Sequence, residues 1–256
     1  MSEFYSSKLL MKGIWQITNK PDGVHSYVDM YLIEGSSKAL LVDAGESNED
    51  LIGFIRTLTE KPVDLLITHG HGDHAAAFAQ FDRVFLSHQD IDILNTIFGY
   101  NMDETMVINL QGGEVFDLGD CKLEVIALPG HTYGSVVLLD AERQLLFSSD
   151  SLGSGGIWMQ LPQCTSVEAY AGELRRLEQR VEGMDHLQIF VGHDCQRSLG
   201  FGKSYLQDVR TVAEKIVSGE VIGRPTENKD DFFGGLFASY GQMSEFIYKP
   251  GNIHMK

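Results

Sequence analysis

The sequence is poor in positive charge and contains no long apolar run. Lys and Arg number 20 against 36 Asp and Glu, which leaves a net charge of −16. Nucleic-acid backbones and anionic membrane surfaces are both bound through Lys and Arg, so this balance disfavours nucleic-acid and membrane partners. No apolar run approaches the length that spans a bilayer. Residues 1–5 also lack the basic start and apolar core of a signal peptide.

Cysteines are scarce as well. Cys121, Cys164 and Cys195 form an odd set without the spacing of a zinc site, so a reducing cytoplasm is the expected location. Cys195 lies two residues after His193, and we interpret it as a small buried residue, not a ligand. The 256 residues can bury a sizeable core as one domain, with residues from about 200 to 256 as a C-terminal helical extension. Whether the chain forms a homo-oligomer stays open.

One short segment holds most of the candidate metal ligands. His69, His71, Asp73 and His74 fall within six residues, and neutral imidazole and carboxylate suit zinc and similar cations. A single His in such a place is usually an ordinary polar residue. This density is hard to explain that way, because protonated imidazoles would repel one another without a metal. The segment follows an apolar strand at 63–68, and its glycines are expected to let the backbone fold tightly.

Other candidates also follow apolar strands: His131 after residues 123–128, Asp150 after 144–149, and His193 after 187–192. Taken alone, each would more often be an ordinary loop residue. Open α/β proteins collect their sites just past the ends of strands. Their shared position therefore predicts that they join the first segment in one metal centre.

The spacing of these residues resembles that of a known family. His-x-His-x-Asp-His, followed at a distance by Gly-His-Thr, by an Asp and by a second Gly-His, is similar to the pattern of the metallo-β-lactamase superfamily of metallohydrolases. The matching segments are residues 68–74, 129–135, 148–151 and 191–194, with the opening strands at 19–45. The resemblance covers about residues 10–195. It implies an α/β fold, an αββα four-layer sandwich of two mixed β-sheets with outer helices.

The resemblance further implies two divalent metal ions held by a shared set of side chains: His69, His71 and His131 for the first, Asp73, His74 and His193 for the second, and Asp150 as the bridge. An all-histidine first site favours Zn²⁺, with Fe or Mn as alternatives. Many β-lactamases have Cys where this pattern places Asp150. The aspartate therefore points towards thioesterase, lactonase or phosphoesterase relatives.

Together these residues predict a hydrolase of small molecules. A water held between two cations loses a proton near neutral pH, and the resulting hydroxide would attack a thioester, a lactone or a related carboxylic derivative. Asp73 or Asp150 would also be able to move a proton, and no Ser, Cys or Lys nucleophile is needed. Alternatives on the same fold are a phosphodiesterase, which the acidic composition disfavours, and an iron-dependent oxidoreductase similar to sulfur dioxygenases.

Some residues near the pattern have two open interpretations. Asp43 would support the metal loop from behind, as in the resembled family, or serve as a simple turn residue. His25 is interpreted as an exposed loop residue and His88 as a polar residue at a strand end. Trp158 and Met159 would line the substrate pocket or pack in the core. The pocket loops are expected at residues 22–27, 100–111 and 153–159.

Helical patterns are predicted at residues 48–60, capped by Ser47 or Asn48, from residue 75 onwards, and at 89–99, 166–182 and 205–218. Strands are predicted at 30–34 and 39–42, and hairpins at 114–128 and around 140–143. Residues 151–159 are predicted to form a glycine-rich loop. Residues 236–256 are expected to form an ordered tail over the site.

Overall fold

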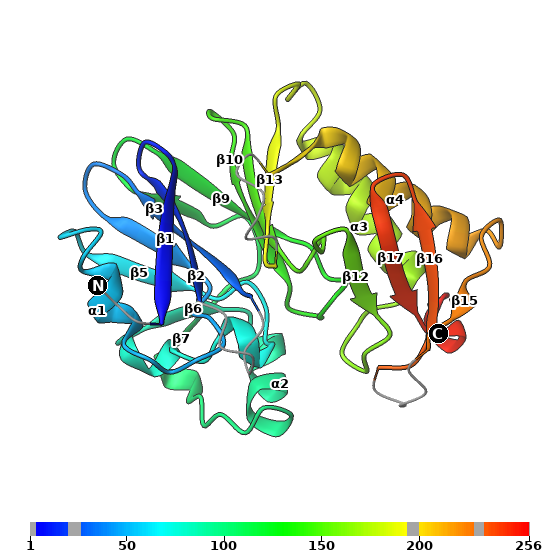
Figure 1. Cartoon of the computed structure of the whole chain (residues 1–256), viewed down its shortest axis with the longest axis horizontal. Coiled ribbons are helices and arrows are strands. Elements are labelled where there is room, and N and C mark those ends of the chain that lie inside the picture. Colours follow the sequence, from blue (N-terminus) through cyan, green and yellow to red (C-terminus); the bar gives the residue numbers. More distant parts are fainter. Residues whose placement is uncertain (1–3, 20–26, 194–199, 228–232, 256) are drawn as a thin grey trace.

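The computed structural model describes residues 4–19, 27–193, 200–227 and 233–255 (Figure 1). Within these residues the first sheet has seven strands in sequential order: β1 (Tyr5–Met11), β2 (Ile14–Asn19), β3 (Asp29–Glu34), β4 (Ala39–Val42), β5 (Val63–Leu66), β6 (Val84–Leu86) and β7 (Val107–Asn109). Strands β1 to β4 are antiparallel, whereas β4 to β7 run parallel. The sheet is therefore mixed, as predicted.

The second sheet has the order β14-β13-β11-β10-β9-β8. Its strands are β8 (Val115–Asp117), β9 (Lys122–Ala127), β10 (Val136–Asp140), β11 (Leu145–Ser149), β13 (Gln188–Val191) and β14 (Phe201–Gly202). Only β11 and β13 pair in parallel. This sheet is mixed too, and it carries three of the predicted ligand loops at its strand ends.

The two sheets face each other, and helices cover their outer faces. Side chains alternate between the two faces of a strand, so Tyr31 and Ile33 of β3 pack towards Leu138 of β10 in the core between the sheets. Met30 of β3 points the other way, into the core under α1 (Leu51–Ile55) and α2 (Ile91–Thr96). Val137 of β10 packs under α3 (Val167–Arg180) and α4 (Lys203–Val217). The order of layers confirms the predicted αββα sandwich (Figure 1).

A third sheet, which the sequence did not predict, is formed by β12 (Gly156–Met159), β17 (Met243–Tyr248), β16 (Leu236–Tyr240) and β15 (Arg224–Pro225), in that order. It lies beside α4 in Figure 1. Part of the expected glycine-rich loop and the expected tail are therefore strands. The reason is the parallel pairing of β12 with β17, in which Ile157 lies opposite Phe246, a partner too distant in sequence for local patterns to reveal.

The helix predicted from Ala75 is wrong. Only short 3-10 turns form there, at Gly72–His74 and Phe78–Gln80. The Ala76 amide donates to the Gly45 carbonyl at 2.9 Å, and the Ala77 amide to the Ala44 carbonyl at 3.2 Å. Because these amides bind the loop after β4, they are lost to an α-helix.

Other boundaries also differ from prediction. Helix α1 is shorter than expected and is capped by Asp50, whose carboxylate accepts from the Gly53 amide at 2.9 Å. Residues 100–111, expected to be irregular, include β7. Strand β1 was missed because only Tyr5 is fully buried, which leaves no alternation to detect. Helices α3 and α4 are confirmed, and none of the described helices is long and apolar enough to cross a membrane.

Candidate metal centre

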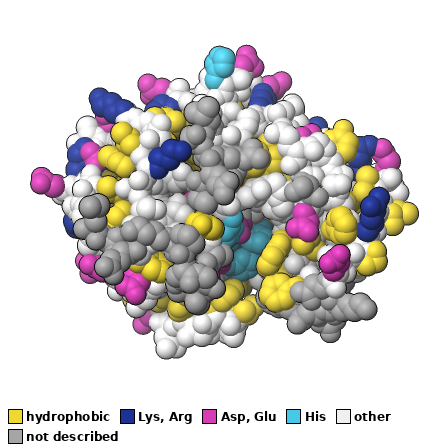
Figure 2. Space-filling model, in the orientation of Figure 1, with side chains coloured by type: hydrophobic (Ala, Val, Ile, Leu, Met, Phe, Trp, Pro, Cys, Tyr) yellow, Lys and Arg dark blue, Asp and Glu magenta, His cyan; other side chains and the backbone are white. Residues whose placement is uncertain are grey.

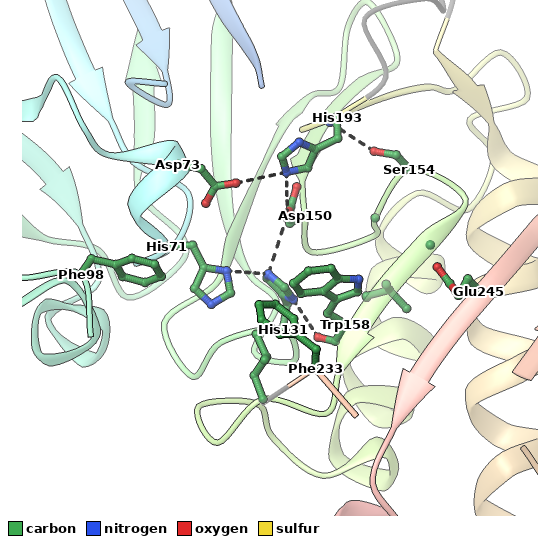
Figure 3. A pocket seen from close by; sticks show the side chains of 14 residues that line it. His71, Asp73, Phe98, His131, Asp150, Ser154, Trp158, His193, Phe233 and Glu245 are labelled. Atoms are coloured by element: carbon green, nitrogen blue, oxygen red, sulfur yellow. Dashed lines mark hydrogen bonds and ion pairs between the residues drawn. The ribbon is translucent and has the colours of Figure 1, made fainter. Parts of the chain in front are cut away.

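The structure brings all of the predicted ligands together at one edge of the sandwich. They come from the loops after β5, β9, β11 and β13. Ligand atoms converge in three overlapping groups, within each of which they lie no more than 4.8 Å apart: His69, His71 and His131; His69, His74 and Asp150; and Asp73, His74 and His193. Figure 3 shows His71, His131, Asp150, His193 and Asp73 turned towards one another. The predicted convergence is confirmed, whereas the metal-binding role of each residue stays a prediction.

The first group is buried and purely imidazole. His71 Nδ1 lies 2.9 Å from His131 Nε2. His69 Nε2 is buried and has no hydrogen-bond partner in the described structure. A buried polar atom without a partner costs free energy, and a metal ion would supply the missing interaction.

The second group faces the opening of the site. His193 Nε2 lies 3.3 Å from His74 Nε2, 3.2 Å from an Asp150 carboxylate oxygen and 3.4 Å from an Asp73 oxygen. The Asp73 side chain is 30% exposed, whereas His74 is fully buried. This group therefore combines two imidazoles with carboxylates that can be reached from solvent.

Asp150 lies between the two groups. One carboxylate oxygen, Oδ2, is 3.2 Å from His193 Nε2 and 3.8 Å from His131 Nε2. The other, Oδ1, is 3.6 Å from His74 Nε2 and is buried without a hydrogen bond in the described structure. The carboxylate therefore has the position expected of a bridge.

Protonation in the first group suits metal binding. Burial lowers the pKa of His69, His71 and His131, so these imidazoles are neutral near pH 7 and have a lone pair available. Neutral imidazole is the form that binds a cation.

The second group takes up protons where a metal ion would bind. Burial would lower the pKa of His74 and His193, but neighbouring carboxylates, Asp73 and Asp150 foremost, outweigh it and raise both, that of His193 to about 9. Burial would raise the pKa of Asp150, but the charges of His193 and His74 hold it well below its usual range. Protons on these imidazoles thus offset the carboxylate charge, and a bound cation would replace them. The donor set fits divalent metal ions.

Four of the five imidazoles donate from their outward nitrogen, Nδ1, to an oxygen. His69 donates to Thr68 Oγ1 at 3.1 Å, and His74 donates to an Asp43 oxygen at 2.9 Å. His131 donates to the Trp158 carbonyl at 2.8 Å, and His193 donates to the Tyr27 carbonyl at 2.6 Å. Such a bond fixes the tautomer, so that Nε2 keeps its lone pair and points into the site.

Asp43 supports the metal loop from behind, as expected. Its carboxylate accepts from the Thr68 amide at 2.8 Å, from the Ser149 hydroxyl at 2.7 Å and from His74 Nδ1 at 2.9 Å. Its backbone has φ 65, which is uncommon outside glycine. Asp43 therefore joins the loop after β5 to the end of β11, so the interpretation as a simple turn residue is wrong.

Asp90, which the sequence analysis missed, joins two other loops. It is fully buried and accepts from the Gly70 amide at 2.8 Å, the Thr132 hydroxyl at 2.6 Å and the Gly134 amide at 2.8 Å. It thereby ties the loop of His69 and His71 to the loop of His131. Nothing in its local sequence indicates this role, because its partners lie 20 to 44 residues away.

The glycines of the ligand loops are required for a reason other than the expected one. Neither Gly70 nor Gly72 has a positive φ. Instead, a Cβ atom on Gly70 would lie 2.6 Å from the Asp90 carbonyl oxygen, and one on Gly192 would lie 2.3 Å from Asp150 Oδ1. These positions therefore need glycine because neighbouring groups approach the backbone closely.

A cavity of about 590 Å³ opens above the ligands. Its apolar wall consists of Phe98, Ile157, Trp158, Leu161 and Phe233. Figure 2 shows imidazole surface at the bottom of a hollow bordered by apolar and acidic side chains. The rings of Trp158 and Phe233 meet edge to face, with centroids 5.6 Å apart. Among the described lining residues there is no Lys or Arg.

The cavity resolves part of what the sequence left open. Trp158 lines it, whereas Met159 is fully buried in the core. Of the loop predicted to line the pocket, Gly153, Ser154, Gly156, Ile157 and Trp158 do so. Residues 100–111 do not line the cavity, whereas Phe98, which precedes them, does. The sequence analysis did not single out Phe98, Phe233 or Glu245, because the walls of a pocket carry no local pattern.

Other sequence candidates lie elsewhere. His88 is exposed, belongs to none of the three ligand groups and is not part of the cavity wall. Strand β6 ends at Leu86, and His88 begins the 3-10 turn that follows it. His25 and Cys195 lie outside the described residues, as does most of the expected loop at 22–27. Cys164 is a buried free thiol whose pKa burial raises to about 12.

Comparison with known proteins adds independent support. A sequence model of the metallo-beta-lactamase superfamily matches residues 24–193. The chain belongs to this superfamily. Human acyl-coenzyme A thioesterase MBLAC2 is 26% identical over 228 residues, covering 75% of this chain and 81% of that protein. The hydroxyacylglutathione hydrolase GloC of Haemophilus influenzae is 30% identical over 139 residues, covering 48% of this chain and 66% of that protein.

Solved structures support the fold. A metallo-beta-lactamase from Pontibacter korlensis superimposes with a TM-score of 0.66 at 19% identity, covering 82% of this chain and 99% of that one. Taken with the sequence relatives, the superfamily match identifies the protein as a metal-dependent hydrolase.

Proposed function

We propose that this member of the metallo-beta-lactamase superfamily is a binuclear zinc hydrolase that cleaves thioesters of small, largely apolar acyl groups. The position of the Asp150 carboxylate carries the proposal. Its Oδ2 lies between His131 of the first group and His193 of the second, and its Oδ1 lies towards His74 of the second. A carboxylate placed in this way serves two ions better than one.

The side chains divide into two metal sites. His69, His71 and His131 would hold the first ion; Asp73, His74 and His193 would hold the second; and Asp150 would contact both. Imidazole-rich sets with carboxylates are typical of zinc. The second set also favours two ions over the single iron of a sulfur dioxygenase-like enzyme. When bound, such a pair supplies a hydroxide near neutral pH and polarises a carbonyl oxygen.

The chain's own residues account for orientation and proton movement. The Asp43 and Asp90 carboxylates hold the ligand loops in position relative to one another. Asp73 lines the cavity and is 30% exposed. It is therefore the carboxylate best placed to take up a proton at an oxygen and pass it to the leaving thiolate or to solvent. Asp150 is less accessible, at 16%, which suits a positioning role.

The cavity supports an acyl substrate. Aromatic and aliphatic groups form one wall, and the charged side chains that line the space are the carboxylates of Asp73, Asp150 and Glu245, beside imidazoles. A phosphodiester would bring negative charge to this wall without a described Lys or Arg to pair with it. The names of two relatives, an acyl-coenzyme A thioesterase and a hydroxyacylglutathione hydrolase, also specify thioesters.

A substrate panel tests the proposal. Short- and medium-chain acyl thioesters, lactones and phosphodiesters would be compared on zinc-loaded enzyme, with the Asp150→Ala variant as the control for contaminating activity. We expect thioesters to have the highest kcat/KM, and the activity to disappear in the variant. A higher kcat/KM for phosphodiesters, or turnover only with a single iron, would overturn the proposed function.

A further inference from the structure

His71 differs from the other imidazoles of the metal centre. The outward nitrogens of His69, His74, His131 and His193 face oxygen atoms. His71 presents Nδ1 to the cluster, 2.9 Å from His131 Nε2, so its outward atom is Nε2. That atom lies 2.7 Å from the side-chain amide nitrogen of Gln163. An amide, unlike a carbonyl or a carboxylate, can either donate or accept.

Gln163 is held against His71 by the loop that joins β12 to α3. On one side of it, the Cys164 thiol donates to the His131 carbonyl at 3.1 Å, and the Thr165 amide donates to the Gly130 carbonyl at 2.9 Å. The loop is thus tied to the segment that carries another predicted ligand. Gln163 is only 6% exposed, so water does not replace it readily as the partner of His71.

The described residues do not hold the Gln163 amide in one orientation. Its oxygen, Oε1, is buried and has no hydrogen-bond partner in the described structure. A half-turn about the last side-chain bond exchanges the oxygen and the nitrogen with little change of shape. The atom that faces His71 Nε2 therefore depends on which of the two ring nitrogens of His71 carries the proton.

The two orientations have opposite consequences for a metal. When the amide nitrogen donates to Nε2, a neutral His71 carries its proton on Nδ1, and Nδ1 has no lone pair for a cation. When Oε1 faces His71, Nε2–H donates to it and Nδ1 is free to bind. Outward partners of ligating histidines set the tautomer in this way and strengthen metal binding.

We propose that Gln163 is a positioning residue of the metal centre. Its amide turns Oε1 towards His71 Nε2–H, which leaves His71 Nδ1 without a proton and able to bind the first ion. The inference rests on the proposed assignment of His71 as a ligand. The orientation of the amide thus determines whether His71 adopts the tautomer that can bind a metal ion through Nδ1.

Two substitutions of Gln163 distinguish the loss of a hydrogen-bond acceptor from a change in the shape of the side chain. Gln163→Met keeps the length of the side chain but offers only a weakly accepting sulfur. Gln163→Glu can only accept while it is ionised. Gln160→Met is the matched control, because Gln160 is a buried glutamine of the same loop, is 2% exposed and does not line the metal cavity. Zinc affinity would be measured by chelator competition, with unfolding followed by circular dichroism.

We expect Gln163→Met to weaken binding of one zinc ion about 10–100-fold, whereas Gln163→Glu and Gln160→Met keep wild-type affinity. Nitrogen-15 spectra of the zinc-loaded wild type should show a proton on His71 Nε2 and none on Nδ1. Unchanged affinity in folded Gln163→Met, or a proton on Nδ1, would overturn the role of Gln163 alone. If His71→Ala left zinc binding unchanged, the ligand assignment of the proposed function would fail instead.

Discussion

Replacing Asp90 by alanine is expected to loosen the two loops that carry His69, His71 and His131. The substitution removes the acceptor of the Gly70 and Gly134 amides and of the Thr132 hydroxyl. A hydrogen bond to a charged group is worth about 1.5–3 kcal/mol, so the three bonds together are worth at least about 4.5 kcal/mol. The cost of burying the carboxylate offsets part of this sum. Each buried donor left without an acceptor costs about 1–3 kcal/mol, so for three donors we expect a loss of about 3 kcal/mol or more.

Urea unfolding would measure this loss. The wild type, Asp90→Ala and the control Asp92→Ala would be compared in excess chelator, because bound metal would otherwise add to the apparent stability. Asp92 lies two residues further along the same helix and is exposed, so its replacement should change the free energy of unfolding by less than about 0.5 kcal/mol. A loss below about 1 kcal/mol for Asp90→Ala, with an unchanged m-value, would refute the role assigned to Asp90.

The effect of Asp90 should also depend on pH. Burial raises the pKa of its carboxyl group, although the hydrogen bonds from Thr132, Gly70 and Gly134 oppose the shift. A group whose pKa is raised on folding contributes most to stability below its unfolded pKa and loses that contribution as the pH rises through its folded pKa. The difference in unfolding free energy between wild type and Asp90→Ala should therefore narrow from acidic towards neutral pH. A difference that widens over the same range would show that the pKa of Asp90 is not raised.

Two further substitutions test the site. Asp150→Ala should reduce kcat by more than the loss of about 10–100-fold that follows removal of a residue behind a metal ligand. It should also weaken the binding of at least one ion, as determined by elemental analysis, and leave the circular dichroism spectrum unchanged. Normal turnover would show that the bridge is misassigned. Trp158→Ala should reduce kcat/KM about 2- to 10-fold at unchanged metal content, since an aromatic contact is worth about 0.5–1.5 kcal/mol. Tyr133→Ala, which removes an exposed aromatic residue outside the cavity lining, is its control. Loss of folding in Trp158→Ala without a selective kinetic effect would assign Trp158 to the core.

The sequence predicted the parts of the site that depend on local order. His131, Asp150 and His193 each follow a strand of the second sheet, and strands of one sheet that run in the same direction end near one another, so their convergence was predictable. His69 follows β5 of the first sheet, and the resemblance placed it with them. The layered fold followed from the resemblance together with the alternation of strands and helices. Both are confirmed.

What the sequence did not predict depends on contacts between distant segments. Asp90 looks like any polar residue at the start of a helix until Gly70 and Gly134 lie beside it. Similarly, Ile157 and Met159 indicate a strand only when β17 pairs with them. The same holds for Gln163, whose partner His71 lies 92 residues away. Local sequence patterns predict which residues lie on a given strand or loop. They do not predict which residues of distant segments will contact it.

The number of metal ions per chain tests the central claim most directly. Protein prepared without chelator would be titrated with zinc and its bound metal determined by elemental analysis, for the wild type and for Asp150→Ala in parallel. The ligand groups on both sides of Asp150 predict saturation at about two ions per chain in the wild type, with weaker binding of at least one ion in the variant. Saturation of the wild type at one ion would contradict the binuclear centre.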